Sequence, residues 1–338
     1  MKLLMFIVVF FGVHMSNARS YYDSMEKLLY NNLMNSEKRF YKYQNLKEKN
    51  DTDNVNYTID NLSKNLLYFS HPTEFNDPFD SKMYVDSRGT EEQWIAFLCD
   101  YQGYNRDTAK KEIEGFFKWE NGLVSSKEHV YKNTIKVPRV CCFSGKRDSI
   151  LMWSHYADHH KGICLCFRAA KNFDDYYIPL RIPNSKTPIY DAKAGVFKEV
   201  IYDNGLIPQI SPFNSQVHIN NIISEQLFTK FEGWEYENEY RIIHPEHLKY
   251  LESPLESSKT LEYYKECLEG VIFGCRINKD NVLHVYEAVN KSNLSKEGNK
   301  IAIKYYKAEE STDKCEIEIK QILDINKFIN DRSVYYEK

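Results

Sequence analysis

Residues 139–167 read RVCCFSGKRDSILMWSHYADHHKGICLCF, and this stretch decides the fold. Residues 140–143 form a short apolar run, and residues 163–167 are apolar at every position. A run that is apolar on both faces is typical of a strand that is covered on both sides. We therefore expect two strands here. The polar aromatic residues between them indicate that the strands frame a pocket.

Between these strands the sequence predicts a polar loop and a short helix. Residues 144–149 form the loop, and residues 150–157 have the apolar density of a helix that packs on a core. Asp148 or Ser149 can cap this helix by accepting backbone N–H bonds. We expect Gly162 to adopt the left-handed conformation in which a chain often leaves a helix.

The segments on either side predict an α+β fold with a mixed, mainly antiparallel sheet core. Upstream we expect a helix at 21–35, strands at 39–43 and 67–70, a helix capped by Thr58, and an inserted helical cap at about 90–132. Downstream we expect a strand at 198–202, a helix at 217–231 and a C-terminal βαββ part at about 270–322. We assign residues 15–338 to a single domain.

The N-terminus allows two interpretations. Residues 1–18 follow the outline of a secretory signal, with an apolar run too short to span a bilayer. Alternatively, residues 1–14 are an over-extended start, because the codons just before Met15 can supply a ribosome-binding site. The eight cysteines lie in adjacent positions or within apolar runs, which is typical of reduced thiols and not of a disulfide framework. We favour a cytoplasmic protein that starts at Met15, with secretion as the alternative.

Composition limits the partners of the chain. The net charge is −3 over 338 residues, which argues against a broad nucleic-acid footprint. A chain of this length can bury a core without disulfide or metal staples. A local phosphate-binding role for Lys146 and Arg147 is a weaker hypothesis.

Three blocks of sequence stand out: FNDPFD at 75–80, MWSHYADHHKG at 152–162 and WEYENEYRI at 234–242. In this order they resemble the signature blocks of a bacterial family that is catalogued as domain of unknown function 2971. The resemblance extends from about residue 39 to residue 277. Because the family description carries no chemistry, the function has to come from the residues themselves.

The third block is rich in charge, since Glu235, Glu237, Glu239 and Arg241 alternate with aromatic and apolar residues. If the segment is a strand, three carboxylates and a guanidinium line one face. Neighbouring carboxylates repel one another, so at least one should have a raised pKa or meet a cationic partner. Such a row can stabilise a positive charge or hold ribose hydroxyls. The alternative is a solvent-exposed edge, with Arg241 paired to Glu239 or to Asp77.

The second block places Trp153, His155 and Tyr156 on the short helix, which follows Ser144. Trp153 or Tyr156 can stack on a planar ring, His155 can act as acid, base or hydrogen-bond donor, and Ser144 can orient a substrate. The structural alternative is a packed core, in which Trp153 fills space and His155 donates to a carbonyl.

The first block predicts a turn, because Pro78 holds Asp77 in an extended conformation and Asn76 suits a turn. Asp77 and Asp80 can serve metal-dependent phosphoryl chemistry. The simpler expectation is that they orient Arg241 or the first strand.

Metal binding and the common nucleotide motifs are not favoured. His155 and His159 are one helical turn apart, and Cys164 and Cys166 follow them. The chain lacks a CxxC motif, however, and both cysteines lie in an apolar strand, so we expect no metal. GxGxxG, GxxxxGK[ST] and GxSxG are also absent from the sequence.

A basic first strand, a strand that ends in serine and a late strand with glutamate resemble, in order and residue type, the active site of ADP-ribosyltransferase-like folds. The resemblance implies that Arg39 holds NAD, that Ser144 supports the nicotinamide pocket, and that Glu239 stabilises an oxocarbenium-like transition state. It implies NAD-dependent ADP-ribosyl transfer or NAD hydrolysis, in phage defence or as a toxin. NAD is then a substrate, and the macromolecular acceptor is unknown.

On this hypothesis the catalytic residues are Glu239, Glu237, His155 and Ser144. The residues expected to bind NAD are Arg39, Tyr41, Trp153, Tyr156, Asn76, Asp77 and Arg241, and Lys42 is an alternative at the first strand. The second hypothesis is a non-enzymatic ligand- or protein-binding module, with an aromatic pocket formed by Trp153, Tyr156, Trp234 and Tyr236.

Overall fold

The structure is a computed structural model of the chain. It describes residues 30–47, 56–120, 123–125, 137–184, 189, 195–245, 259–292 and 302–331. The predicted N-terminal segments at 1–14 and 1–18 lie outside these residues, as do the start of the helix predicted at 21–35 and residues 126–132 of the predicted insertion.

Contacts within the chain define two compact units, each built from separate segments. Unit 1 holds Met1–Tyr68, Cys142–Phe197 and Thr260–Lys338. Unit 2 holds Phe69–Cys141 and Lys198–Lys259. The assignment of residues 15–338 to a single domain stays a prediction.

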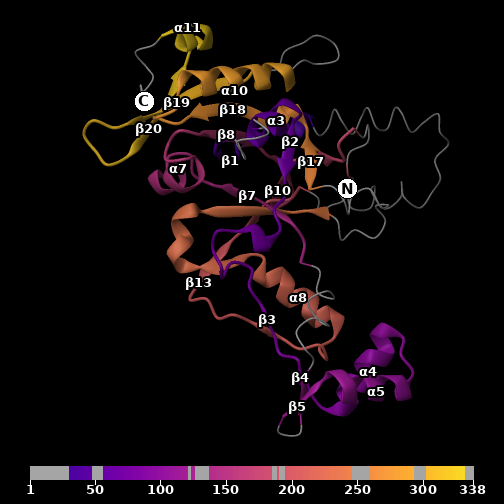
Figure 1. The fold of residues 1–338 in the computed structure, drawn as a ribbon. Helices are drawn as coiled ribbons and strands as arrows, with labels where there is room; N and C mark the ends of the chain where they lie inside the picture. The colour runs from indigo at the N-terminus through magenta and orange to yellow at the C-terminus, as the bar shows by residue number, and fades with distance from the viewer. Residues whose placement is uncertain are drawn as a thin grey trace, which may run out of the picture. The chain divides into compact units, whose positions relative to one another are not determined.

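A mixed, mainly antiparallel sheet forms the core of unit 1 (Figure 1). Its strands follow the order β7, β1, β8, β18, β19, β20, and of these neighbours only β18 and β19 run parallel. The bounds are β1 Arg39–Gln44, β7 Val140–Ser144, β8 Ile163–Arg168, β18 Leu268–Phe273, β19 Lys304–Glu310 and β20 Ile317–Ile322. The predicted α+β class is therefore confirmed.

Unit 1 has further short strands and helices among its described residues. The strands form the sheet β11-β17-β2 and the hairpin β9–β10. Their bounds are β2 Leu66–Tyr68, β9 Ala170–Asn172, β10 Asp175–Tyr177, β11 Leu180–Arg181 and β17 Thr260–Tyr263. Residues 30–34 are helical. The further α-helices are α3 Tyr57–Ser63, α7 Ile150–Tyr156, α10 Lys279–Ser292 and α11 Ile325–Asn330, and η4 at Lys265–Cys267 is a 3₁₀ turn.

The C-terminal βαββ part agrees with its prediction. Because β18 and β19 are parallel, the chain needs a crossover between them, and α10 supplies it. In Figure 1 α10 lies along these strands, and Val282, Val285 and Val289 on its inner side are buried. Phe273 of β18 stacks on Tyr305 of β19 with a centroid distance of 5.9 Å.

The N-cap of α3 and the backbone conformation of Gly162 differ from the sequence predictions. Ser149 caps α7 as expected, with its hydroxyl accepting from the Met152 amide, but Asn56 and not Thr58 caps α3. Gly162 does not adopt the left-handed conformation. Asp158, His159 and His160 have positive φ instead.

The reason for a glycine at position 162 is close packing. A Cβ there would lie 2.2 Å from the Gln44 carbonyl oxygen and 3.1 Å from backbone atoms of Ala157. Only glycine lets the chain pass between the end of α7 and strand β1 without displacing backbone.

Unit 2 is built from strand pairs and short helices. β12 Lys198–Glu199 pairs antiparallel with β16 Glu239–Ile243, while β13 Ile201–Asp203 with β15 Thr229–Phe231 and β14 Gln209–Ile210 with β3 Tyr84–Val85 are parallel pairs. Three of its helices are η1 Pro72–Glu74, α8 Gln216–Gln226 and η2 Glu232–Glu237. The strand predicted at 198–202 is thus divided in two. The helix predicted at 217–231 ends at residue 226, and β15 follows it from residue 229.

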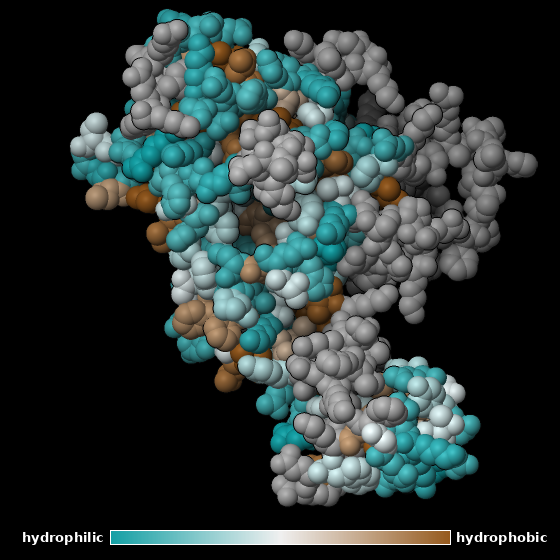
Figure 2. Space-filling view, in the orientation of Figure 1, coloured by the Kyte–Doolittle hydropathy of each residue, from teal (hydrophilic) through white to brown (hydrophobic). Residues whose placement is uncertain are grey.

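The predicted helical insertion contains strands as well. Helices α4 Glu91–Gln102 and α5 Arg106–Phe116 are followed by β5 Lys118–Glu120 and β6 Leu123–Ser125, which pair with β4 Arg88–Gly89. Trp94, Phe97 and Ile113 form its buried apolar cluster together with neighbouring side chains. Trp119 lies on β5 and is half exposed. Figure 2 shows a mainly hydrophilic surface over α4 and α5, which agrees with apolar side chains that face inward.

Within the described residues, no helix combines the length and the apolar character needed to cross a bilayer. All eight cysteines are among these residues, and all are free thiols.

Candidate functional site

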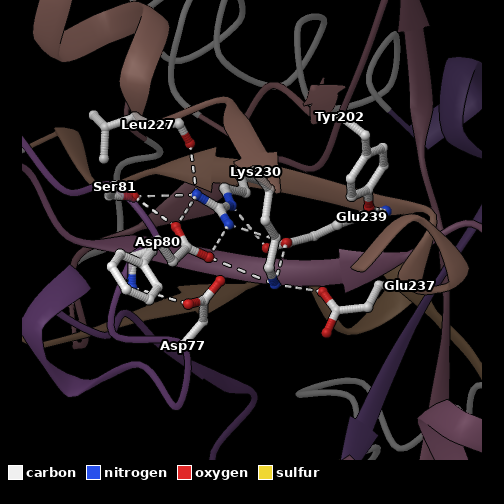
Figure 3. A network of polar contacts seen from close by, with 10 residues as sticks. Asp77, Asp80, Ser81, Tyr202, Leu227, Lys230, Glu237 and Glu239 are labelled. Carbon is white, nitrogen blue, oxygen red and sulfur yellow. Dashed lines mark hydrogen bonds and ion pairs between the residues drawn. The ribbon is translucent and has the colours of Figure 1, made fainter. Parts of the chain in front are cut away.

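Unit 2 holds a buried cluster of five charged side chains (Figure 3). We call it the ionic cluster, and its members are Asp80, Lys230, Glu237, Glu239 and Arg241. Charges are tolerated inside a protein only when they are paired and hydrogen-bonded. The geometry of these pairs therefore decides what the cluster can do.

Arg241 on β16 is fully buried and its guanidinium is saturated with acceptors. Asp80 accepts in a bidentate manner, from Nη1 at 2.9 Å and from Nη2 at 2.6 Å. Glu239 also accepts twice, from Nε at 2.7 Å and from Nη2 at 3.0 Å. Nη1 further donates to the Leu227 carbonyl at 2.7 Å and to the Ser81 hydroxyl at 3.2 Å. A planar fork that meets two carboxylates in this way fixes both of them in place.

Lys230 on β15 is the second cation of the cluster and is 6% exposed. Its Nζ lies 2.5 Å from Glu237 Oε2, 3.2 Å from Glu239 Oε2 and 3.5 Å from Asp80 Oδ2. It also lies 5.0 Å from the ring centroid of Trp234, within the range of a cation–π interaction. Lys230 thus connects the carboxylates to an aromatic side chain.

The local backbone around Asn238 differs from the strand predicted for the third block. Residues 232–237 form the 3₁₀ helix η2, and Asn238 ends it in the left-handed conformation with φ of 45°. Strand β16 begins only at Glu239. This turn, and not the alternation of a strand, brings Glu237 and Glu239 to the same ammonium group.

For the carboxylates of the third block we predict either a raised pKa or a cationic partner, and the second of these predictions is confirmed. The repelling carboxylates meet a cationic partner, Lys230, which sequence analysis missed. The alternative of a solvent-exposed edge is wrong, because Glu237, Glu239 and Arg241 are buried, but the pairing of Arg241 with Glu239 that it included is confirmed. The predicted orientation of Arg241 by the first block is confirmed for Asp80.

Tyr202 on β13 completes the wall around Glu239. Its hydroxyl oxygen accepts a 2.8 Å hydrogen bond from the Glu239 backbone N–H. Burial raises the pKa of Tyr202, so the hydroxyl stays protonated at neutral pH.

A pocket of about 340 Å³ opens beside the ionic cluster within unit 2. Its lining residues are Asp77, Phe79, Asp203, Gly205, Leu206, Ile207, Gln226, Thr229, Lys230, Phe231 and Trp234. Lys230 belongs to both the pocket and the ionic cluster. The ionic cluster therefore borders the pocket through Lys230.

The rim of this pocket carries large apolar side chains that are exposed to solvent. Leu206 is 91% exposed, Phe79 is 57% exposed and Phe231 is 48% exposed. Single exposed apolar residues are ordinary, but three that line one pocket are typical of a binding site.

Asp77, which lines the pocket, has one carboxylate oxygen without a hydrogen-bond partner among the described residues. The residue is 6% exposed. Its Oδ1 accepts from the Phe79 amide at 2.9 Å, whereas Oδ2 is buried and has no hydrogen-bond partner among the described residues. Buried polar atoms are nearly always bonded in folded proteins, so this oxygen requires an explanation.

The other residues predicted for the site lie in unit 1, except the exposed Asn76 and the half-buried Tyr236, which lie in unit 2. Arg39 donates from Nε to Glu269 and from Nη1 to the Ser36 carbonyl at 2.8 Å. Burial raises the pKa of Tyr41 to about 12. Both side chains lie on β1, as predicted from the alternating character of this segment.

The residues around α7 are mainly packed side chains. Trp153 is fully buried, its Nε1 donates to the Arg147 carbonyl at 3.0 Å, and its ring packs edge-on against Tyr43. Ser144 is fully buried and its hydroxyl accepts from the Lys146 amide at 3.1 Å. His155 is exposed.

The neighbouring Tyr156 is half-buried, with its ring centroid 6.4 Å from that of His155. For Trp153, these contacts agree with the predicted alternative of a packed core. No group of three potential metal ligands occurs in the part of the chain that the structure describes.

Comparison with protein families gives one match, to the model described as "Protein of unknown function (DUF2971)", over residues 152–242. The match covers the second and third sequence blocks. In unit 2 it includes Lys230 and the cluster members of the third block, Glu237, Glu239 and Arg241. The first block, which supplies Asp77 and Asp80, lies outside it. Searches of curated proteins and of solved structures give no match. The ADP-ribosyltransferase resemblance therefore receives no support from these comparisons.

Proposed function

We propose that unit 2 is a small-molecule-binding module whose ligand occupies the pocket beside Trp234. The observation that supports this most is the pocket itself, in which the buried Lys230 and an exposed apolar rim line the same cavity. Its volume of about 340 Å³ falls in the usual range of ligand sites, about 300–1,000 Å³. The ligand on this proposal is a small organic molecule with an apolar body.

The ionic cluster supports this proposal because it makes the wall of the pocket rigid. Lys230 has three carboxylate oxygens within 3.5 Å, and Arg241 locks two of these carboxylates from the other side. A preorganised wall reduces the entropy that a ligand must remove on binding. Trp234 lines the same pocket, and the Lys230 ammonium lies over its ring.

The enzymatic hypothesis, NAD-dependent ADP-ribosyl transfer, gives Glu239 a different task. Glu239 is 4% exposed and is bound by both Arg241 and Lys230. To reach a ribose it would have to leave both cations, and uncompensated buried charges cost about 3–5 kcal/mol. We therefore place ligand binding ahead of NAD turnover, and NAD remains one candidate ligand for direct test.

A fragment screen with a matched pair of variants tests the proposal. Thermal-shift and ligand-observed NMR measurements on the wild type are expected to give hits among small aromatic fragments. Leu206→Ser should weaken these hits, whereas Leu323→Ser should leave them unchanged. Leu206 lines the pocket at 91% exposure, and Leu323, at 92% exposure, lies in unit 1. Hits that bind equally to both variants, or a wild type without hits, would contradict the proposal.

A further inference from the structure

Asp77 defines the chemical class of the ligand, provided that the proposed pocket is a binding site. Asp77 is one of the lining residues of the pocket, and its buried Oδ2 atom has no hydrogen-bond partner among the described residues. The other carboxylate oxygen is occupied by the Phe79 amide. A bound ligand with an N–H donor at this position would satisfy the free oxygen.

The charges around the pocket favour a donor that is also a cation. Five carboxylates line the pocket or contact Lys230, which lines it, and they belong to Asp77, Asp80, Asp203, Glu237 and Glu239. Among the described residues, the cations that pair with these carboxylates are Lys230 and Arg241, so the formal balance of this set is −3.

Both of these cations are already engaged by carboxylates of the ionic cluster. Lys82 lies 5.2 Å from the Phe79 ring centroid but does not line the pocket. An anionic ligand would therefore meet Asp77 and Asp203 without a cation free to receive it.

The aromatic lining limits the rest of the ligand. Phe79, Phe231 and Trp234 all contribute rings to the pocket. Ring faces favour planar apolar bodies and are attracted to positive charge.

We propose that the pocket binds a cationic aromatic amine, with its ammonium or amidinium group on Asp77 Oδ2 and its ring among the three aromatic side chains. The same geometry disfavours the phosphate groups of NAD in this pocket. The ligand class is thus narrower than small organic molecules in general.

Three indole probes of similar shape test this inference on the full-length protein: tryptamine, which is cationic, indole, which is neutral, and indole-3-propionate, which is anionic. Dissociation constants are measured at pH 7 by ligand-observed NMR and isothermal titration calorimetry. We expect tryptamine to bind at least tenfold more tightly than indole-3-propionate, with indole between them. Added salt should weaken tryptamine binding and leave indole binding unchanged.

The matched variants are Asp77→Asn and, as a control, Asp174→Asn. The amide of Asp77→Asn retains an oxygen that can accept from the Phe79 amide but loses the charge. Tryptamine binding should fall about tenfold in Asp77→Asn while indole binding is kept. Asp174 is an exposed residue of unit 1, and its variant should match the wild type.

The outcomes separate the two proposals. Indole-3-propionate binding as tightly as tryptamine, or unchanged tryptamine binding in Asp77→Asn, overturns the cationic class while the pocket stands. If neither these probes nor any fragment of the screen binds the wild type, the pocket itself is overturned. The wild-type comparison does not depend on the folding of any variant.

Discussion

Replacing Arg241 by Gln is the most demanding perturbation of the ionic cluster. The substitution removes a buried guanidinium that makes four contacts of 3.0 Å or less with Asp80 and Glu239. Two buried carboxylates then share only Lys230 as a cation, together with Glu237. Breaking one partner out of a buried ion-pair network costs about 3–5 kcal/mol, because the remaining charges stay buried without compensation.

Urea unfolding, followed by tryptophan fluorescence, measures this cost. Three of the four tryptophans, Trp94, Trp119 and Trp234, lie in unit 2, so the signal reports mainly on this unit. We expect Arg241→Gln to lower the free energy of unfolding of unit 2 by about 3–5 kcal/mol. Arg106→Gln is the control in the same unit, because Arg106 pairs with Glu92 on the surface, and its midpoint should stay close to that of the wild type. A loss for Arg241→Gln no larger than that of Arg106→Gln would refute the reasoning.

Three further perturbations concern glycine packing and two partly or fully buried charged residues, Glu269 and Lys307. Gly162→Ala should lower the free energy of unfolding by about 1–3 kcal/mol, because its Cβ would lie 2.2 Å from the Gln44 carbonyl oxygen. Gly115→Ala, at a helical position with open space around it, should raise the free energy of unfolding by about 0.5–1 kcal/mol. Equal melting midpoints of the two variants in differential scanning fluorimetry would contradict this. Burial would raise the pKa of Glu269, but hydrogen bonds from two arginines outweigh it and hold the pKa at about 2, below its usual value of 4.5. The stabilisation from Glu269 should therefore be complete above pH 4.5 and be lost as the pH falls towards 2, and Glu269→Gln should flatten this acid limb of the stability curve; an unchanged limb would show that the arginine contacts are not formed. Lys307 is buried, and burial lowers its pKa from 10.5 to about 8. Its contribution to stability should therefore rise from pH 8 towards 10, and the melting temperature of the wild type should rise relative to that of Lys307→Met over this interval. A constant difference in melting temperature between the two proteins would argue against this.

The strands of unit 1 could be predicted because each carries its own pattern. β1 alternates, β8 is apolar throughout, and the βαββ part has a strand-length apolar run before a helical period. The parallel pairing of β18 and β19 is a property of distant residues, and local periodicity does not specify it.

The errors have identifiable physical causes. Asn56 and Thr58 are both capping residues two positions apart, and propensity alone does not choose between them. Gly162 suggested a helix end by its residue type, but its actual requirement comes from the Gln44 carbonyl, more than 100 residues away in sequence. The helical pattern of 90–132 hid the short strands β5 and β6, which are too brief to show a period.

Most members of the ionic cluster could be predicted from the sequence, but its central residue, Lys230, could not. Glu237, Glu239, Arg241 and Asp80 stand in recognisable blocks, whereas Lys230 lies between a helix and the third block without a motif of its own. The available signal was the excess of carboxylates, which required a cation from elsewhere in the chain. The pocket could not be predicted, because its rim joins residues near 77, 206 and 231 that only the fold of unit 2 brings together.

Intermolecular nuclear Overhauser effects between a bound aromatic fragment and the protein test the central claim most directly. The account predicts contacts from the fragment protons to the Trp234 ring and to the Leu206 methyl groups, both of which line the pocket. Contacts found only to residues outside this pocket, with none to Trp234 or Leu206, would contradict it.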